Sequence, residues 1–595
     1  MRRVSLRKVC EYQLYALAFA LPFEFYIHGR ERSLLTTLKL QILVLFVTWT
    51  ATKLIETRAR PETARNRIMG LLPDRFLPAV TALILVQSLS AALAPAFRGN
   101  AIEAAAKMML GAFFALLVGD VVLGSRPQDD RSDNPAMSTL LALSVSGTCV
   151  ALLGLGELAG IGFFARIAHV FQPSKFNLGQ HLRLVSTMEY PNTAGSFLSV
   201  ALCATLALTS FSGTVRERKW SIASVAVVGI QGIALAFTYS RGAIVSTIIA
   251  VAVASAMSKS WIRGAQGRIA QASCLAVLLG GALAAYYVHR ASEHTPRTQQ
   301  RIARFGLQGA EEVMSLHPAL TYGETIAVQN DSCCTWRKGT YGVGYRWHNL
   351  SSNENSSPQI GTDFTSDLAP SELARVQVAL RTPPQAGEYF LIWFVFQRSD
   401  QVREVKDSYS PGILCIIHPA GTDAGRAITD KARRYLGAIR EERRSLNGAQ
   451  VPTRGELWSV AIRMFRQRPI LGMGPDNFRL LKWKYMEVPQ GDETILANST
   501  YLDLLSGSGI LGIAAFAWLM WEFGRGVARR LSPGASHSDW ILGYFGTAYL
   551  TGFLSHGLVD YFLKFTPTFL LFWLVVGIVC LGGRASAENV CADRL

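Results

Sequence analysis

The chain has 595 residues, half of them hydrophobic, and its mean hydropathy is positive at +0.23. Apolar runs as long as a spanning helix, which needs about 20 residues, recur from one end to the other. The net charge of +17 is not accompanied by a basic, aromatic-interleaved soluble domain, which argues against nucleic-acid binding. The composition therefore predicts a polytopic membrane protein.

About twelve spans are expected from the length of the apolar runs. The first of them lacks a small-residue cleavage site, so we expect it to be retained rather than removed as a signal peptide. The expected spans are Leu14–Ile27, Leu34–Ile55, Ala79–Ala96, Ala101–Leu123, Met137–Leu158, Asn192–Phe211, Ser221–Phe237, Ala243–Met257, Ala270–Val288, Tyr501–Trp521, Trp540–Leu558 and Thr566–Leu581.

The orientation follows from basic residues in the short loops, which mark the cytoplasmic side. With twelve spans, all of the basic clusters fall on one face; they are Arg2–Lys8, Arg58–Arg67, Arg216–Lys219, Lys259–Arg268 and Arg525–Arg530. Both termini are then cytoplasmic, and the protein is expected in a bacterial inner membrane with its opposite face in the periplasm.

The chain divides by composition into residues 1–288 with nine spans, a large periplasmic loop over 289–500, and residues 501–595 with three spans. Within the loop, short strand-like runs separated by Gly, Pro, Asn and Ser predict a small β-sandwich over 319–419. The runs are Thr325–Gln329, Tyr341–Trp347, Ala374–Leu380, Tyr389–Phe396 and Ile413–Ile417. It resembles the Ig-like accessory domains found beside bacterial carbohydrate-active proteins. The loop's second part, 424–490, has helical periodicity. The expected fold is thus an all-α polytopic membrane protein with an inserted periplasmic, Ig-like β-sandwich.

Several motifs on the expected periplasmic face follow one another along the chain. They are Arg183 with Glu189-Tyr-Pro-Asn192, Ser240-Arg241-Gly242, Arg454-Gly-Glu-Leu-Trp458, Gly472-Met-Gly474-Pro-Asp-Asn477-Phe478, Asn498-Ser-Thr-Tyr501-Leu502 and Gly507-Ser-Gly509-Ile-Leu-Gly512. In this order they resemble the O-antigen ligase and polymerase superfamily of membrane glycosyltransferases. Among them, the resemblance implies that Asn192, Arg454, Asn498 and Tyr501 are motif or structural positions.

The resemblance implies transfer of a glycan from an undecaprenyl-diphosphate-linked donor to an acceptor at the periplasmic membrane face, as in lipopolysaccharide and polysaccharide biosynthesis. The acceptor stays open between a lipid A core, a lipid-linked repeat unit and a protein side chain, the last as in a protein O-oligosaccharyltransferase. The alternative class is a non-catalytic glycan transporter or carbohydrate-binding membrane protein. A transporter should show repeated halves, and no internal repeat is visible.

A diphosphate leaving group needs charge stabilisation, and arginine binds phosphate oxygens bidentately while always charged. We therefore predict Arg241 and Arg183, with Lys39, as diphosphate ligands. The alternative for both arginines is a cation that snorkels to lipid head groups or pairs with a carboxylate. A further intramembrane cation, Lys107, could join the same diphosphate pocket, but the favoured expectation is that it pairs with Glu103 four residues before it on one helix face.

The acceptor hydroxyl needs a base within hydrogen-bond reach. Ligases of the resembled family carry a His-Asn-x-x-Leu run, and aligning its leucine with Leu502 puts Asn498 at the histidine position. An amide cannot act as a base, so either another group serves as the base, or this member has a different acceptor, or its activity is lost. Glu189 and His556 are the catalytic candidates, and Asp560 also reaches this face; packed and solvated roles are the alternatives.

No cofactor and no metal are expected, because the outer face shows no His, Cys, Asp and Glu group at metal-ligand spacing. The expected partners are the lipid-linked donor, a lipid or glycan acceptor, and membrane lipids. Cys333, Cys334 and Cys415 lie in the β insertion, and one of the adjacent pair is a candidate for a disulfide to Cys415.

Overall fold

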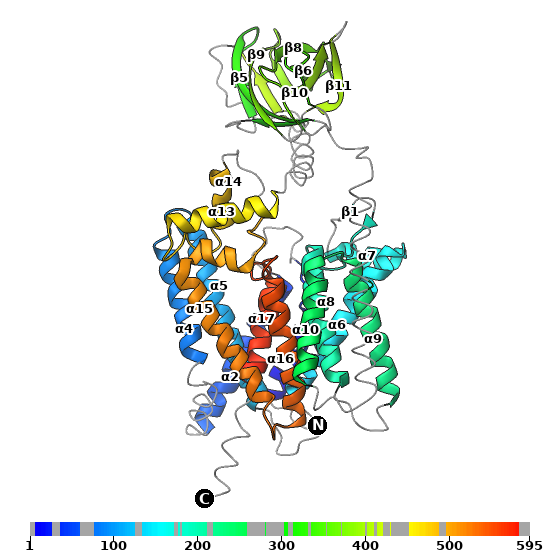
Figure 1. The fold of residues 1–595 in the computed structure, drawn as a ribbon, viewed down its shortest axis with the longest axis vertical. Coiled ribbons are helices and arrows are strands. Elements are labelled where there is room, and N and C mark those ends of the chain that lie inside the picture. Colours follow the sequence, from blue (N-terminus) through cyan, green and yellow to red (C-terminus); the bar gives the residue numbers. More distant parts are fainter. Residues whose placement is uncertain are drawn as a thin grey trace, which may run out of the picture. The chain divides into compact units, whose positions relative to one another are not determined.

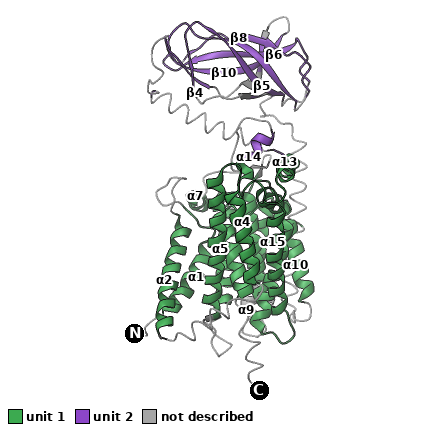
Figure 2. Ribbon diagram, turned by 90° about the vertical axis from the view of Figure 1, so that its left-hand side faces the viewer, with its two compact units in different colours: residues 1–295, 454–480, 496–595 green, residues 296–453, 481–495 purple. Residues whose placement is uncertain are grey.

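The computed structural model forms two compact units (Figure 2). The first contains residues 1–295, 454–480 and 496–595, and the second contains 296–453 and 481–495. The structure describes residues 6–25, 36–59, 76–124, 134–171, 177–178, 181–210, 218–258, 280, 303–307, 313–330, 335–352, 354–369, 372–398, 402–409, 413–419, 429, 452–486 and 495–581.

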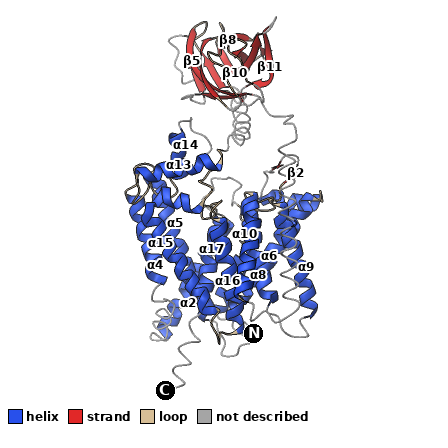
Figure 3. Ribbon diagram, viewed as in Figure 1, coloured by secondary structure: helices blue, strands red, loops and turns tan. Residues whose placement is uncertain are grey.

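The first unit is a bundle of helices, with α13 lying across one end of it (Figures 1 and 3). We call this the α13 end and the opposite one the far end. The described helices that contribute to this unit are α1 Leu6–Ala20, α2 Thr37–Ala59, α4 Phe76–Ala92, α5 Arg98–Gly124, α6 Pro135–Leu158, α7 Gly162–Phe171, α8 Pro191–Ser210, α9 Arg218–Phe237, α10 Arg241–Met257, α13 Arg454–Gln467, α14 Phe478–Met486, α15 Thr500–Arg530, α16 His537–His556, α17 Thr566–Val576 and the π-helix Gly577–Leu581. A short hairpin, β1 Asn177–Leu178 and β2 His181–Leu182, precedes α8.

The helices agree with a membrane protein. Among the described residues, five are long and apolar enough to cross a bilayer: Thr37–Arg58, Arg98–Leu123, Pro135–Leu158, Pro191–Thr209 and Thr500–Arg530. The other expected spans overlap shorter or less apolar helices, and Ala270–Val288 lies almost entirely outside the described residues. The bounds of the first span were wrong, because α1 ends at Ala20 and a turn at Leu21–Pro22 follows it. The total of twelve stays a prediction.

Helix α15 is broken where the glycine motif lies. Gly509 has φ 64° and ψ −162° inside the helix, and Ile510 N donates to the carbonyl of Pro469 at 2.8 Å. A Cβ on Gly509 would lie only 2.3 Å from the carbonyl oxygen of Ile470. On the other side of this contact Gly472 has φ 67° and equally lacks room for a Cβ. The glycines are therefore required where the loop 469–474 and the kink touch.

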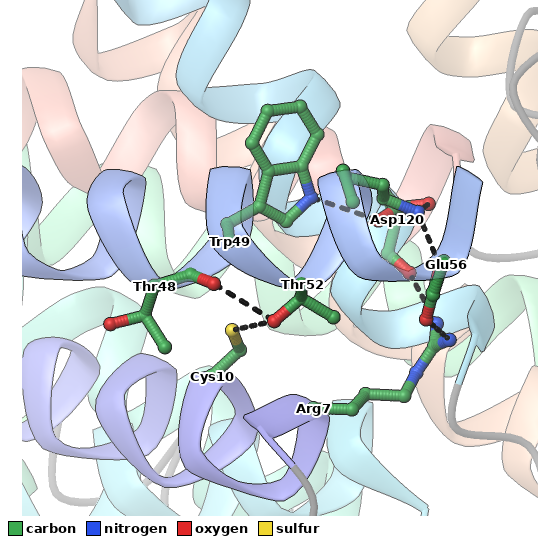
Figure 4. Close-up of polar contacts among 8 residues, drawn as sticks. Arg7, Cys10, Thr48, Trp49, Thr52, Glu56 and Asp120 are labelled. Carbon is green, nitrogen blue, oxygen red and sulfur yellow. Dashed lines mark hydrogen bonds and ion pairs between the residues drawn. The ribbon is translucent and has the colours of Figure 1, made fainter. Parts of the chain in front are cut away.

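A polar network ties α1, α2 and α5 together at the far end (Figure 4). The Lys53 Nζ lies 2.6 and 2.7 Å from the two carboxylate oxygens of Asp120, whose side chain is 3% exposed. Trp49 Nε1 donates to the same carboxylate at 2.9 Å. Arg7 donates to Glu56 Oε1 at 3.0 Å and to the Asp120 carbonyl at 3.2 Å. Buried charges are thus paired, as an apolar surrounding requires.

The described strands of the second unit form two β-sheets. The larger has the order β4-β12-β10-β6-β7, with β11 also pairing with β10 and β8 with β6, and the smaller has the order β3-β5-β9. Among these described strands, β4 and β12 pair in parallel and the other pairs are antiparallel. The strands are β3 Ala303–Leu307, β4 Val313–Leu316, β5 Thr321–Asn330, β6 Tyr341–Asn349, β7 Glu354–Asn355, β8 Gln359–Asp363, β9 Leu373–Arg381, β10 Gly387–Arg398, β11 Val402–Tyr409 and β12 Ile413–Ile417.

Residues from both sheets share one apolar core, so this unit is a sandwich of strands. Trp347 and Tyr389 are buried in that core, so their rings pack inside the sandwich and are not exposed to stack on a sugar. Cys415 is buried there with a free thiol, so the expected bridge to it is absent; Cys333 and Cys334 lie outside the described residues. The Ig-like type of the sandwich stays a prediction.

Candidate functional site

The segments that carry the motifs converge at the α13 end of the helical unit. Leu184 N donates to the Phe237 carbonyl at 2.9 Å, which fixes the Arg183 segment beside the turn that precedes α10. Thr500 N donates to the carbonyls of Gly557 and Asp560 at 2.8 and 3.0 Å. These bonds hold the start of α15 against the turn between α16 and α17, which we call the outer turn, residues 557–565.

Arg183 is held by two neighbouring segments. Its Nε donates to the Thr238 carbonyl at 2.9 Å and its Nη2 to Asn192 Oδ1 at 3.2 Å. The pKa of Arg183 is lowered to about 10; burial is the main cause, the positive charge of Arg241 adds to it, and Asp560 opposes the shift. With that pKa the guanidinium still carries its charge at neutral pH. Asn192, expected as a motif position, is therefore a direct ligand of Arg183.

Arg241 lies at the first position of α10 and is exposed. Its cap residue, Ser240, makes no side-chain bond to the helix, and the first intrahelical donor is Ile244 N, at 3.0 Å from the Ser240 carbonyl. The first backbone N–H groups of α10 thus have no partner within the helix, which leaves a partial positive charge there. Among the described residues no acceptor hydrogen-bonds the Arg241 guanidinium, so it is available to an anion.

Asp560 is the carboxylate that the structure places among these arginines. One of its oxygens accepts from Tyr561 N at 2.8 Å, whereas Oδ2 is buried and makes no hydrogen bond of good geometry among the described residues, with the Asn192 side chain near this carboxylate. Burial raises the pKa of Asp560, and Tyr561 N, Arg454, Asn192 and Arg183 oppose that rise. A buried carboxylate with an unused oxygen and a raised pKa is a candidate base.

His556 ends α16 and is packed rather than open. Its ring lies 4.4 Å from the ring of Phe562, centroid to centroid, and its Nδ1 is 3.4 Å from Ser196 Oγ. A cavity of about 40 Å³ adjoins the ring, and it has room for a few water molecules but not for a sugar. A Cβ on Gly242 would lie 2.9 Å from two atoms of this ring. The Ser-Arg-Gly motif therefore needs its glycine to admit His556.

The other motif residues divide between the site and the scaffold. Arg454 begins α13, and its charge acts on both Asp560 and His556. Asn498 has φ 49°, a left-handed conformation that asparagine tolerates better than most residues. Tyr501 donates from its hydroxyl to the Leu554 carbonyl at 2.7 Å, which joins α15 to α16.

Glu189 and Lys39, the other two site candidates, are both exposed in the helical unit. Glu189 is exposed on the turn before α8, and the carboxylate acting on Arg183 is Asp560 instead. Lys39 is exposed near the start of α2, and its charge acts on Glu24 and Lys107.

The expected Glu103–Lys107 pair was wrong. Lys107 Nζ donates to the Lys564 carbonyl at 2.6 Å and lies 4.8 Å from the centre of the Phe569 ring. The partner of Lys107 is thus a backbone carbonyl on the outer turn and not Glu103 on the same helix. Sequence spacing cannot reveal such a partner.

A set of charged residues that the sequence motifs did not single out lies beside the outer turn. Asp476 has φ 59°, and its Oδ2 lies 2.6 Å from Lys564 Nζ and 3.0 Å from Arg479 Nε. Arg479 and Asn477 are further joined to Asn100 at the start of α5. The only sequence signal for this set was the position of Asp476 inside the Gly-Pro-Asp-Asn motif.

The protein-family model described as O-antigen ligase matches residues 389–517. The match includes the Arg454, Gly472–Phe478, Asn498–Leu502 and Gly507–Gly512 motifs, and it confirms the resemblance to the O-antigen ligase and polymerase superfamily, whose members are membrane glycosyltransferases.

No curated protein matches the chain. A solved structure of Pseudomonas fluorescens alkylpurine DNA glycosylase AlkC, bound to DNA containing an abasic site analog, is 10% identical. That match covers 57% of this chain and 97% of the glycosylase, and its TM-score of 0.14 is too low to carry an argument.

Proposed function

Because the match over residues 389–517 supports glycosyl transfer of the O-antigen ligase or polymerase type, we propose that this protein transfers a glycan from an undecaprenyl-diphosphate-linked donor to an acceptor hydroxyl. The observation that carries the proposal is the grouping of Arg183, Arg241 and Asp560 at one end of the helical unit. In the proposed topology the α13 end faces the periplasm and both termini are cytoplasmic. This agrees with the basic loops.

The arginines act on the leaving group. As the bond between the anomeric carbon and the phosphate oxygen breaks, its electron pair stays on the diphosphate, and negative charge develops there. The Arg241 guanidinium and the first N–H groups of α10 are positioned beforehand to stabilise that charge. Arg183 adds a second guanidinium that stabilises the same charge. Its hydrogen bonds to Thr238 and Asn192 already hold it in place, so its side chain does not need to move.

Asp560 acts on the acceptor. The acceptor oxygen forms the new bond to the anomeric carbon, and its proton passes to the unused Oδ2 of Asp560. Burial raises the pKa of this carboxyl, which makes its anion a stronger base than an ordinary aspartate. Asp560 is then the base, a role that the amide of Asn498 cannot fill. His556 packs against the outer turn and supports its position.

The diphosphate is neutralised by guanidinium groups in this scheme, so metal-independent transfer is part of the proposal. Among the described residues no group of three or more His, Cys, Asp and Glu side chains could hold a metal ion. Transfer measured with and without a chelator tests this part directly, and a loss that Mg²⁺ or Mn²⁺ restores would contradict it.

The test is transfer of a lipid-linked glycan by the full chain in membranes. Arg241→Lys keeps the charge but loses the bidentate fork, and we expect transfer to fall on the order of 10²-fold, as for loss of one positioned donor. The matched control is Arg166→Ala on α7, an exposed arginine whose Nε donates to the Gly162 carbonyl. Near-normal transfer by Arg241→Ala would overturn the proposed site.

The same assay separates the acceptors. Supplying a lipid A core, a lipid-linked repeat unit or a protein substrate in turn distinguishes ligase, polymerase and protein O-oligosaccharyltransferase activity. Binding of the donor without transfer to any of them would instead favour a carbohydrate-binding or transport protein.

A further inference from the structure

A second basic cluster lies at the α13 end, formed by Lys107, Lys564 and Arg479 around Asp476. The Asp476 Oδ2 lies 2.6 Å from Lys564 Nζ and 3.0 Å from Arg479 Nε. Lys107 joins through the Lys564 carbonyl, to which its Nζ donates at 2.6 Å. Helix α5, the loop before α14 and the outer turn thus meet at one set of charges.

The position of these cations in the proposed topology is unusual. Lysine and arginine are concentrated on the cytoplasmic side of membrane proteins, and the proposed topology puts this cluster on the opposite side. Lys107 lies within an apolar helix. Burying a charge there costs free energy, so an ionisable residue at such a position indicates a functional site. Three acidic residues, Glu24, Asp476 and Asp503, lie near these cations. They do not outnumber the positive charges, because Lys39 adds a further one that acts on Lys107.

The two ammonium groups of this cluster have hydrogen-bond donors that the described contacts do not use. An ammonium group has three donors, and the bonds described above use one donor of Lys107 and one of Lys564. The side chain of Lys564 is 36% exposed, so a ligand can reach it. Asp476 holds Lys564 and Arg479 through one oxygen, while its Oδ1 is buried without a partner among the described residues.

This cluster is distinct from the group around Asp560. The charges that act on Asp560 are those of Arg454 and Arg183, and none comes from the second basic cluster. Asp560 and Lys564 nevertheless belong to the same outer turn. Four residues of chain span at most about 14 Å, so the two groups are close enough for substrates bound at each to react.

We propose that the second basic cluster binds the phosphate group of a second lipid-anchored substrate, the acceptor. The inference rests on the proposed function, in which Arg241 and Arg183 bind the diphosphate of the donor. A phosphate held by Lys564 and Lys107 anchors the acceptor on the other side of the outer turn. Its glycan then extends toward Asp560, where the hydroxyl loses its proton.

The experiment titrates farnesyl diphosphate into the full chain in phosphatidylcholine nanodiscs. Two binding events are expected in the unaltered protein. Lys564→Gln should weaken one event by about 10-fold or more, because a hydrogen bond to a charged group is lost, and leave the other unchanged. Arg241→Ala should do the reverse, Lys564→Arg should keep both events, and the control Arg166→Gln should alter neither.

Specific outcomes overturn the inference. A single event in the unaltered protein does so, as does loss of the same event in Lys564→Gln and Arg241→Ala. If Lys564→Gln loses both events, Lys107→Gln decides, and it must weaken only the event that Arg241→Ala spares. An insensitive Arg241→Ala, with a Lys564-dependent event intact, counts against the proposed donor site alone.

A last arm identifies the source of the phosphate. Adding phosphatidylglycerol to the nanodiscs should leave the Lys564-dependent event in place; its disappearance would mean an ordinary phospholipid site and overturn the inference. Repeating the titration with a phosphorylated lipid A distinguishes a polyprenyl diphosphate acceptor from a phosphorylated glycolipid.

Discussion

The contact between Gly242 and His556 allows a sharp test of how the site is positioned. In Gly242→Ala the added Cβ would lie 2.9 Å from His556 Cδ2, His556 Nε2 and Val559 Cγ2. Carbon atoms prefer separations of about 3.5–4.0 Å, so something must move by roughly 0.6–1.1 Å. The His556 ring packs against Phe562, 4.4 Å away between ring centroids, and Phe562 and Val559 both belong to the outer turn. The displacement therefore falls on the outer turn, which carries Asp560.

Two consequences are expected from that displacement. Overpacking costs about 1–3 kcal/mol of stability, offset in part by the higher helix propensity of alanine. A catalytic group misplaced by about 1 Å costs on the order of 10²-fold in rate. Gly242→Ala should thus lower glycan transfer about 10²-fold with a modest drop in unfolding temperature, both measured on the same detergent-solubilised preparation.

The matched control is Gly229→Ala on α9, where an added Cβ meets nothing within 4 Å. This variant should retain full transfer and equal or greater stability. In a His556→Ala background two of the three contacts disappear, so Gly242→Ala should cost less stability there. Equal transfer by Gly242→Ala and Gly229→Ala, or an unchanged cost in the His556→Ala background, would refute the reasoning.

Two further predictions concern Asp560 and the far end. Because burial raises the pKa of Asp560 and the ionised form is the base, transfer should fall as pH drops through a value above the ordinary 3.9 or so. Asp560→Asn should remove that acidic limb of the pH–rate profile and lower transfer about 10²–10⁴-fold; an unchanged limb would contradict the assignment. At the far end, Asp120→Asn leaves Lys53 without its main partner, and we expect a loss of about 3–5 kcal/mol, as for breaking a buried ion pair, measured by thermal unfolding. Replacing the pair by Lys53→Met with Asp120→Leu should recover most of it, which a simple packing role for Asp120 would not predict.

The sequence predicted most of the helices of the first unit, because apolar runs long enough to cross a bilayer follow one another closely along the chain. It also predicted five strands of the second unit, since β5, β6, β9, β10 and β12 contain the expected runs. It missed β3, β4, β7, β8 and β11, whose residues are too few or too polar to stand out. The pairing of β4 with β12 joins segments about a hundred residues apart, which local pattern cannot reveal.

The candidate site could be predicted only as far as local motifs reach. Arg183, Arg241 and Asn192 were identified from motif and position, and the structure brings Arg183 to Asn192. The partner carboxylate could not be chosen from sequence, because Glu189 and Asp560 both reach the same face. The choice depends on burial, and that is set by how the outer turn folds against the start of α15.

The backbone around the site supports a functional reading of these residues. Tyr239, Asp476 and Asn498 all have positive φ values, between 49° and 59°, and each lies in a segment that contributes to the α13 end. Such conformations cost about 1–3 kcal/mol each and persist only where surrounding structure imposes them. Asp560 adds a further cost, because a carboxyl whose pKa is raised on folding destabilises the folded state once pH exceeds its unfolded value. Asp560→Asn should therefore be at least as stable as the unaltered protein at neutral pH while losing transfer. A residue kept for stability would give the opposite pair of results.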